Sequence, residues 1–558
     1  MKALQLFSKY APNKTFIAIL LGSLSGLLYA MLIPIVMVSL SNDANFLQGD
    51  ESITTFLGFE ISNSKYALLF LIICILILIF RTLSEVILAR IALDIRFGIR
   101  KELYSKIENS PVASLESVGP SRLIQSLTTD ILAIVGGAQL FPSLVTNVVT
   151  LLGMLTYLAY INEHVFMLII QVIFFGVLSY QIPIYFGTKF FIRAREHQDI
   201  LQEAFKGVVE GSKELKLSKQ KQKVYKQSIL YKQEILVTEL QKKGITIYAA
   251  ARNYGDLLAF FAIGMLSFIL INYYPISSTE TIAAVMVLLY VTGPISMLLN
   301  FIPQLARTNI SLRKIDQLYK ELPDEGVADS VDNAPEWSSL HFKNVIYKYN
   351  QEKANDNPFQ IGPINLEISR GQITFVTGGN GSGKSTLAKL ISHHYLPDSG
   401  EILFSNTVVN KNNLSSIREE ISCIYSSYYL FDRILIAKEL SADYEEKARH
   451  YLKAFGIDDK VTIKDGKFST LNLSDGQRRR IALVVSIIED KPLLIFDEWA
   501  ADQDPQFKDI FYKEILKDLK QKNKAVVVIS HDDRYFNVAD KILVMESGKL
   551  IETVTKSV

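Results

Sequence analysis

The chain has 558 residues, more than one hydrophobic core usually supports, so at least two domains are expected. Hydrophobic residues make up 49% of it, and 59 basic against 57 acidic side chains leave a formal charge of +2. Such a balance gives no support for nucleic-acid binding, and two cysteines exclude a disulfide framework.

The apolar excess lies in the first half of the chain. Several stretches there are long enough to cross the ~30 Å hydrocarbon core of a bilayer as helices of about 20 residues. They are residues 16–40, 66–93, 131–160, 165–186, 247–271 and 281–302. The first is longer than the apolar core of a cleavable signal, and no small-residue cleavage site follows it. We therefore predict six membrane spans.

Lysine and arginine are distributed unequally between the segments that flank these stretches. They precede the first stretch and follow the second, fourth and sixth, whereas residues 41–64, 161–164 and 272–280 contain none. The positive-inside rule places both termini in the cytoplasm. We expect an integral multi-pass protein of the bacterial cytoplasmic (inner) membrane, in contact with membrane lipids.

Two cytoplasmic segments are long, polar and helically periodic, so the spans before and after them are predicted to continue beyond the bilayer. Helix-breaking residues lie near each tip, Pro111 and Pro120 in the first segment and Gly207 and Gly211 in the second. A short helix at each tip is expected to dock on the following domain, and the alternative is a solvent-exposed loop.

Charged residues inside the spans are candidates for a wet cavity. Arg81 with Glu85, and Arg252 with Asp256, are i,i+4 pairs in the second and fifth stretches. An unpaired charge at the bilayer centre costs ~2.5–3.5 kcal/mol, so each should be paired or face water. The alternative to a ligand contact is an ion pair within the helix.

An acidic, proline-containing segment follows the last span and marks a domain boundary. We predict a transmembrane domain at residues 1–320, a linker at 321–338 and a second domain at 339–558. From Leu340 onward, short β-branched runs alternate with helical segments, which is the pattern of an α/β domain.

A glycine-rich segment lies between an apolar run that begins at Ile373 and a helical segment. It reads Gly378-Gly379-Asn380-Gly381-Ser382-Gly383-Lys384-Ser385-Thr386. Strand, glycine loop and helix are the setting of a P-loop, in which backbone N–H groups and the helix N-terminus hold the β- and γ-phosphates of ATP. Lys384 would neutralise the phosphates, and the Ser385 hydroxyl would ligate Mg²⁺.

Two carboxylates end a later apolar run. Asp497 and Glu498 follow Leu493-Leu494-Ile495-Phe496, which reads as a buried strand. Asp497 is predicted to hold Mg²⁺, directly or through water, and Glu498 to polarise the attacking water. Tyr349, upstream of the P-loop, is a candidate to stack on adenine; the alternative is a strand tyrosine that covers the sheet edge.

Two further segments carry a resemblance to a known family. Leu473-Ser474-Asp475-Gly476-Gln477 resembles the signature of ABC ATPases, with Asp475 replacing the usual first glycine, and Val527-Val528-Ile529-Ser530-His531 is similar to their strand and switch histidine. With six spans ahead of them, these motifs resemble a half-size ABC exporter. The resemblance implies an all-α six-helix transmembrane domain followed by an α/β P-loop ABC ATPase domain, as in type IV exporters.

The resemblance also implies how the site works. Ser474, Gly476 and Gln477 would meet the γ-phosphate of ATP that the other subunit's P-loop holds, so a homodimer is expected. His531 would lie near the γ-phosphate. The chain is thus expected to hydrolyse ATP with Mg²⁺ and to export a substrate by alternating access.

Two segments narrow the resemblance. Trp499-Ala500-Ala501-Asp502-Gln503-Asp504-Pro505 and Gly211-Ser212-Lys213-Glu214-Leu215-Lys216-Leu217 are similar to the cyclic-peptide exporter family, which includes transporters for siderophore peptides, lipopeptides and a lasso microcin. A peptide natural product, cyclic, knotted or siderophore-type, is the implied cargo. The alternatives are a lipid or lipid-linked-oligosaccharide flippase, and an ATP-gated, non-transporting membrane regulator, against which Glu498 and His531 argue.

One position departs from the family pattern. Most ABC ATPases have a glutamine four residues before the pair that corresponds to Leu430-Phe431, and this chain has Ser426 there. The glutamine normally reaches Mg²⁺ and links it to the membrane domain. The shorter serine argues against direct ligation from this position.

Overall fold

The computed structural model describes residues 10–40, 54–56, 59–61, 64–326, 337–349, 359–435 and 443–555. The chain forms two compact units. The membrane unit comprises Met1–Glu102 and Gln125–Asp316, and the P-loop unit comprises Leu103–Ile124 and Gln317–Val558. The tip of the first cytoplasmic segment therefore belongs to the P-loop unit. Most of the acidic linker, residues 327–336, lies outside the described residues.

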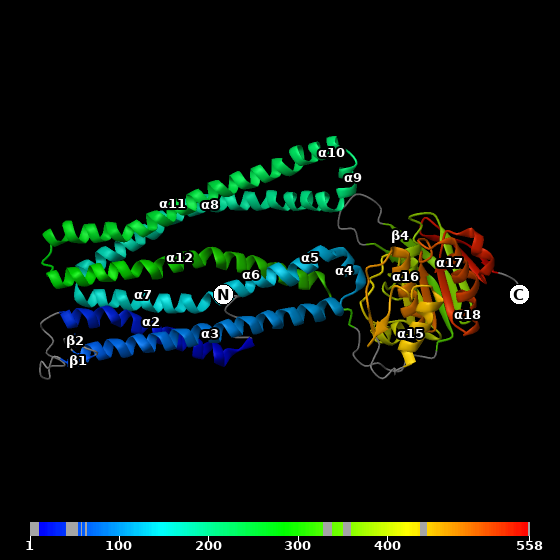
Figure 1. Ribbon diagram of the computed structural model, residues 1–558, viewed down its shortest axis with the longest axis horizontal. Coiled ribbons are helices and arrows are strands. Elements are labelled where there is room, and N and C mark those ends of the chain that lie inside the picture. Colours follow the sequence, from blue (N-terminus) through cyan, green and yellow to red (C-terminus); the bar gives the residue numbers. More distant parts are fainter. Residues whose placement is uncertain are drawn as a thin grey trace. The chain divides into compact units, whose positions relative to one another are not determined.

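Helices, most of them long, build the membrane unit (Figure 1). They are α2 Pro12–Leu40, α3 Ser64–Glu108, α6 Ile131–Gln139, α7 Phe141–Ile161, α8 Glu163–Glu210, α11 Lys232–Phe268 and α12 Ser278–Glu321. In the described residues, six helical segments are long and apolar enough to cross a membrane, which confirms the predicted spans. With 45 residues in α3 and 48 in α8, helices also extend well beyond the ~20 residues that a bilayer needs, as predicted.

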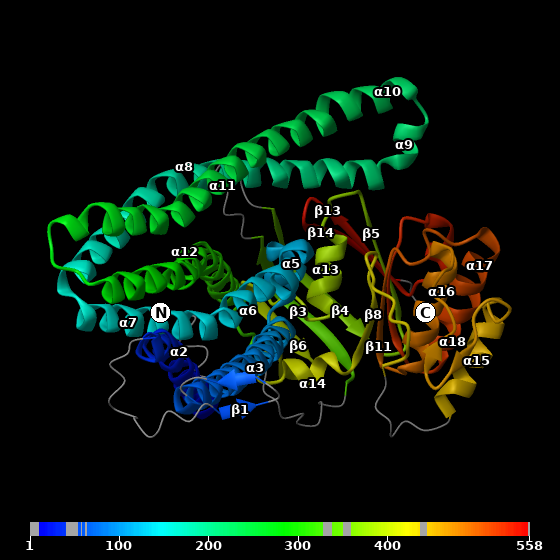
Figure 2. The same cartoon turned by 60° about the vertical axis from the view of Figure 1, so that its left-hand side comes forward.

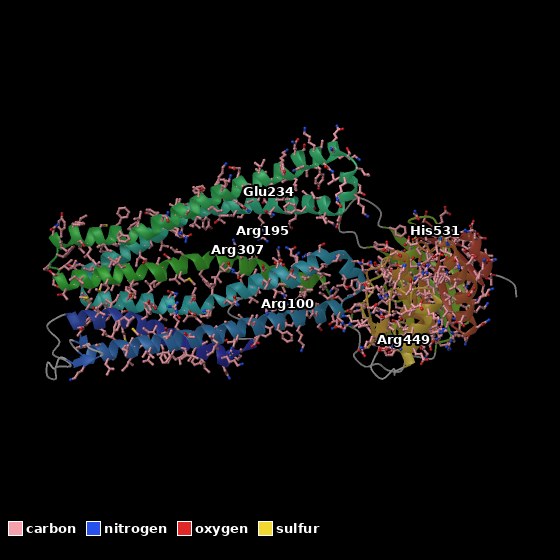
Figure 3. All side chains as sticks on the ribbon, viewed as in Figure 1. Arg100, Arg195, Glu234, Arg307, Arg449 and His531 are labelled. Carbon is pink, nitrogen blue, oxygen red and sulfur yellow. The ribbon has the colours of Figure 1, made fainter. Side chains whose placement is uncertain are left out.

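Charged side chains mark one level along these helices. Arg100, Arg195, Glu234 and Arg307 lie at that level on α3, α8, α11 and α12, away from the hairpin of β1 (Thr54–Phe56) and β2 (Phe59–Ile61) (Figure 3). Between the hairpin and this level the side chains are mainly apolar, and large ones such as Phe174 and Phe260 are exposed. This distribution is expected of helices that face lipid or a partner subunit.

Short elements join the long helices at the two cytoplasmic tips. They are α4 Val112–Val118, α5 Pro120–Gln125, η1 Ser126–Asp130, α9 Ser212–Lys216, α10 Lys219–Val224 and η2 Tyr225–Tyr231, with η3 Leu270–Asn272 at the far end of α11. Helix α4 lies in the P-loop unit and packs on it through Ala113, so the prediction of a docked tip helix is confirmed for the first segment. Helix α9 forms at the second tip, and its docking stays a prediction.

The P-loop unit contains a six-stranded sheet of order β14-β13-β5-β12-β11-β8 and a four-stranded sheet of order β4-β3-β6-β7 (Figure 2). The strands are β3 Ser339–Lys348, β4 Gln360–Ser369, β5 Ile373–Gly378, β6 Ser399–Phe404, β7 Thr407–Val408, β8 Ile421–Ile424, β11 Leu493–Asp497, β12 Ala525–Ile529, β13 Lys541–Glu546 and β14 Lys549–Thr555. A hairpin of β9 (Ile463–Lys464) and β10 (Lys467–Phe468) lies apart from them.

Helices pack around these sheets. They are α13 Lys384–Ile391, α14 Leu414–Arg418, α15 Asp443–Ala454, α16 Asp475–Ile488, α17 Pro505–Ile510, η4 Phe511–Ile515, α18 Leu516–Gln521 and η5 Asp533–Val538. Every residue of β11 and β12 is buried, which explains why both strands read as continuous apolar runs.

The sheet brings the predicted motifs together. Strand β12 pairs in parallel with β11 on one side and with β5 on the other, and β8 pairs in parallel with β11. Ile529 of β12 lies opposite both Asp497 and Val376. Because parallel strands present their carboxyl ends at one edge, the segments that follow all four strands meet there.

Candidate ATP site and membrane pocket

The P-loop follows β5 and opens α13, as predicted. Gly378, Gly381 and Gly383 have φ values of +149°, +76° and +103°, which glycine adopts readily. At Gly378 a side chain would also collide with the backbone carbonyl of Met545 on β13. The tight path of the loop therefore depends on its glycines.

Lys384 is held within the loop. Its Nζ donates hydrogen bonds of 3.0 Å to the carbonyl oxygens of Gly378 and Gly379, and the residue is 6% exposed. Asn380 and Gly381 at the tip are exposed, whereas Ser382 is buried. The lysine charge thus lies where the loop and the N-terminus of α13 would receive phosphate oxygens.

Asp497 has the surroundings of a cation ligand. It is 1% exposed at the end of β11, and neither carboxylate oxygen has a hydrogen-bond partner within 3.5 Å. Burial raises the pKa of this carboxyl, and groups of Ser426 and Ser385 that face it oppose the rise. A buried carboxylate without partners is costly, so Asp497 and the Ser385 hydroxyl fit a Mg²⁺ ion with oxygen ligands.

Glu498 and His531 lie side by side, with Glu498 Oε1 3.3 Å from His531 Nε2. The backbone N–H of Glu498 donates to the carbonyl of Ile529, so the pairing of β11 with β12 sets this contact. The Glu498 and His531 side chains are 38% and 46% exposed, which leaves them open to water. The geometry suits a general base beside a histidine.

The signature residues form the start of α16. Ser474 Oγ accepts a hydrogen bond from the Gln477 backbone N–H, and Gln477 Oε1 accepts one from the Ser474 N–H, which makes a capping box. The Gly476 carbonyl accepts from Gln503 Nε2 at 2.9 Å. In the described part of the chain, no hydrogen bond or ion pair joins Ser474, Gly476 or Gln477 to a P-loop residue.

Two arginines that follow the signature on α16 contact the residues from Glu498 to Gln503. Arg479 donates to the carbonyl of Glu498 at 2.9 Å and pairs with Asp502, and Trp499 Nε1 donates back to the Arg479 carbonyl. Arg480 contacts Gln503 at 3.0 Å. Sequence reasoning missed these roles, although the unusual Trp499–Pro505 segment indicated that this region differs from most relatives.

Tyr349 lies beside the P-loop helix. Its hydroxyl is 2.8 Å from Thr386 Oγ1, so Thr386, the last residue of the predicted loop, contacts this tyrosine. The ring is half-buried and meets the Tyr395 ring edge-on, with centroids 6.0 Å apart. These contacts place Tyr349 next to the loop, and adenine stacking stays a prediction.

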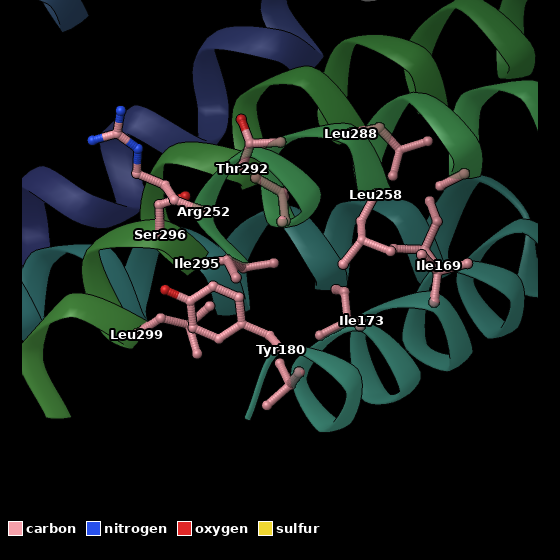
Figure 4. Close-up of a pocket in the computed structure, with 16 residues that line it drawn as sticks. Ile169, Ile173, Tyr180, Arg252, Leu258, Leu288, Thr292, Ile295, Ser296 and Leu299 are labelled. Carbon is pink, nitrogen blue, oxygen red and sulfur yellow. The ribbon is translucent and has the colours of Figure 1, made fainter. Parts of the chain in front are cut away.

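A pocket lies between α8, α11 and α12 of the membrane unit (Figure 4). Its volume is about 70 Å³, and most of its wall is aliphatic, with Ile173, Leu258 and Leu288 among the lining side chains. Polar groups gather toward one end, where Tyr180 lies, and Arg252 extends its guanidinium away from the aliphatic wall (Figure 4). The pocket thus combines an apolar body with a polar end.

The predicted charged pairs have different outcomes. Arg81 Nε lies 3.1 Å from Glu85 Oε1, so this pair forms within α3, as the alternative proposed. Arg252 lines the membrane pocket, and the Asp256 side chain lies outside the described residues. Among the described side chains of these pairs, Arg252 lines the pocket.

Comparisons with known proteins identify the family. The ABC transporter family model matches residues 361–501. This range begins in β4, includes the P-loop, the signature and the Asp497–Glu498 pair, and ends at Ala501. ATP-binding protein SyrD of Pseudomonas syringae pv. syringae is 32% identical over 488 residues, which cover 86% of this chain and 86% of SyrD. The chain belongs to the ABC exporter half-transporter family. It is a multi-pass membrane protein that binds and hydrolyses ATP.

A solved structure described as a bacterial Atm1-family ABC exporter with ATP bound has the same fold. The match has a TM-score of 0.75 and covers 98% of this chain and 95% of that chain. Because the two sequences are only 15% identical, the match shows the fold alone. It confirms the predicted fold class, six apolar helices followed by an ABC ATPase domain.

A third relative matches over a shorter length. The ATP-dependent lipid A-core flippase of Wigglesworthia glossinidia brevipalpis is 31% identical over 224 residues, which cover 38% of this chain and 37% of the flippase. That length is about that of the P-loop domain alone, so the match supports the ATPase assignment and does not distinguish between cargoes.

Proposed function

We propose that two copies of this chain form an exporter that moves a peptide natural product out of the cytoplasm. The observation that carries the dimer is the separation of the P-loop from the signature, which share no hydrogen bond or ion pair in the described part of one chain. A second copy would bring Ser474, Gly476 and Gln477 to the γ-phosphate held by the first copy's P-loop. Each dimer would then hold two ATP molecules.

Each residue of the site has a role in this scheme. The P-loop from Gly378 to Thr386 and the N-terminus of α13 bind the phosphates, Lys384 neutralises their charge, and Tyr349 stacks on adenine. Ser385 and Asp497 hold Mg²⁺, which when bound neutralises charge on the β- and γ-phosphates. Glu498 accepts a proton from the attacking water, and His531 supports it beside the γ-phosphate.

Binding and hydrolysis act on different steps. ATP binds at the interface between the two ATPase domains and so favours the closed dimer, whereas ADP lacks the γ-phosphate that the signature contacts. Each conformation is thus preferred by a different nucleotide state, which is what a transport cycle requires. By the positive-inside rule, the P-loop and both termini would lie in the cytoplasm and the spans in the bacterial inner membrane.

The membrane pocket, about 70 Å³, is large enough for one side chain or a short acyl segment of an amphipathic cargo. Its aliphatic wall suits apolar side chains or an acyl group, and Arg252 at its edge suits an anionic or polar group. The Arg252 guanidinium extends away from this wall, so it would meet a polar or anionic part of the cargo that lies outside the pocket (Figure 4). With the Trp499–Pro505 and Gly211–Leu217 segments, this favours a compact peptide, including siderophore-type peptides, over free lipid.

The test is ATP-dependent uptake into inside-out vesicles, with cyclic or knotted peptides compared with fluorescent lipids. We expect peptide uptake that is lost in Glu498→Gln and reduced in Arg252→Gln. Arg81→Gln is the matched control, because Arg81 already pairs with Glu85 within α3. Lipid flipping without peptide uptake would instead support a flippase, and ATP turnover with neither would support a membrane regulator.

A further inference from the structure

Glu498 has a backbone conformation that few residues other than glycine adopt. Its φ is +51°, in the left-handed region, where the Cβ atom crowds the backbone of every residue except glycine. This conformation turns the chain as β11 ends, and the Ala501 N–H closes the turn by donating to the Glu498 carbonyl at 3.2 Å. A strained conformation persists only where the surroundings hold it, so the contacts of this turn decide where the Glu498 carboxylate points.

One cation from the signature helix α16 holds this turn. Arg479 Nη1 donates to the carbonyl oxygens of Glu498 and Trp499, at 2.9 and 3.3 Å. Arg479 Nη2 lies 2.8 Å from Asp502 Oδ2, and the Arg479 side chain is only 11% exposed. Because a guanidinium is planar and presents its N–H groups in a fixed arrangement, these contacts fix the directions of both carbonyls together.

The helix that carries Arg479 is itself anchored in the core of the domain. Ile481 and Leu483, on the same helix, are both fully buried. Trp499 Nε1 donates to the Arg479 carbonyl at 2.9 Å, and the buried Trp499 ring packs on Phe511 with centroids 4.5 Å apart. The core therefore sets the position of the guanidinium, and the guanidinium holds the turn after β11.

The Glu498 carboxylate depends on this turn more than on its own contacts. Its contact with His531 joins two side chains that are open to water, so that contact is too weak to hold the carboxylate alone. In the part of the chain that the structure describes, the Trp499 carbonyl accepts its hydrogen bond from Arg479. Loss of Arg479 would leave this carbonyl of a buried residue unpaired, which is costly, and the turn would relax toward negative φ at Glu498.

We propose that Arg479 is a positioning residue for ATP hydrolysis, which holds the left-handed turn at Glu498 and so directs the Glu498 carboxylate at the attacking water. This inference rests on the proposed function, in which Glu498 accepts a proton from that water. A misplacement of a reacting group by about 1 Å costs ~10²-fold in rate. Arg479 should therefore contribute to kcat and leave the affinity for ATP nearly unchanged, because the phosphates bind to the P-loop.

The experiment is a double-mutant cycle on the full-length protein in nanodiscs. It compares the parent, Arg479→Met, Glu498→Gln and the variant with both changes, and methionine keeps an unbranched stem while it removes every donor. Phosphate release from radiolabelled ATP gives kcat and KM, and binding of a fluorescent ATP analogue and thermal unfolding are measured in parallel. Arg449→Met is the matched control, because it removes only an exposed ion pair with Glu445 on α15 (Figure 3).

We expect Arg479→Met to lower kcat by ~10–100-fold, with KM for ATP within ~3-fold of the parent and of Arg449→Met. In the Glu498→Gln background the same change should alter turnover by less than ~2-fold, because no carboxylate remains to be positioned. A residue that only supports the fold would lower turnover by the same factor in both backgrounds.

Arg479→Lys keeps the charge but lacks the planar fork, so it should recover part of the lost kcat. The same cycle is measured with Arg479→Lys, so the test does not depend on the folding of Arg479→Met.

Two results would overturn the inference while the proposed function stands. The first is turnover by both Arg479 variants at the rate of the parent and of Arg449→Met. The second is an equal loss of turnover in both backgrounds, which would assign Arg479 to the stability of the domain. Turnover by Glu498→Gln within a few-fold of the parent would instead contradict the role of Glu498 in the proposed function, and this inference with it.

Discussion

Replacing Glu498 by glutamine tests the catalytic geometry of the ATP site. The substitution keeps the size of the side chain and removes its capacity to accept a proton from water. Loss of a positioned general base costs at least ~10² in kcat, which corresponds to about 2.7 kcal/mol of activation free energy. We therefore expect ATP hydrolysis to slow by at least ~10², with ATP binding nearly unchanged.

The structure indicates that the variant should fold. The Glu498 backbone is fixed by its N–H bond to Ile529 and by the Arg479 and Ala501 donors to its carbonyl, none of which involves the carboxylate. The contact with His531 is between half-exposed groups, so its loss should change the free energy of unfolding by less than ~1 kcal/mol.

The assay is steady-state phosphate release by the full-length protein, beside binding of a fluorescent ATP analogue. Glu401→Gln, an exposed carboxylate on β6, controls for the loss of a charge elsewhere in the domain. Turnover within a few-fold of the parent would refute the role of Glu498 as the base, whatever the affinity for ATP.

Three other substitutions test the metal ligand, the coupling between the domains and the dependence of stability on pH. Asp497→Asn should raise the Mg²⁺ concentration for half-maximal ATPase activity by ~10–100-fold, since a buried ligand loses its charge; an unchanged Mg²⁺ titration would refute that role. Ser426→Gln should alter the ratio of substrate-stimulated to basal ATPase activity more than ATP affinity, and an unaltered ratio would show that this position does not couple the domains. Burial and the nearby Arg418 lower the pKa of His393 to about 3, so the unfolded chain binds a proton that the folded chain does not between pH ~6.5 and ~3. As the pH is lowered through this range, His393 should reduce the free energy of unfolding by up to ~1.4 kcal/mol per pH unit. In His393→Asn this decrease should be smaller when unfolding is followed by the fluorescence of Trp337 and Trp499. An unchanged slope would contradict the lowered pKa.

The local chemistry of the ATP site was predictable because each part is encoded within one short segment. A glycine loop between a strand and a helix, and two carboxylates after an apolar run, each specify their own conformation. The parallel register of β5, β12 and β11 then brings them to one edge. The spans were predictable for a similar reason, since length and apolar character alone decide whether a helix can cross a bilayer.

Contacts between distant segments were not predictable from the sequence. Glu116 and Lys389 are 273 residues apart, and neither stands in a segment with a recognisable pattern. Arg81 and Arg252 have similar sequence surroundings, yet only Arg252 lines a pocket, because the packing of α8, α11 and α12 decides which side chains face a cavity. Such choices depend on tertiary packing rather than on local sequence.

We propose that each ATP site is built from two chains, and cross-linking between the chains tests this arrangement. One tagged population carries Asn380→Cys at the exposed tip of the P-loop, and a differently tagged population carries Asp475→Cys beside the signature serine. Both also carry Glu498→Gln, Cys74→Ser and Cys423→Ser, and they are mixed before reconstitution. We expect ATP and Mg²⁺ to induce a disulfide that joins the two tags. ATPase activity of the parent protein as a strict monomer, with no ATP-dependent cross-link between the tags, would contradict it.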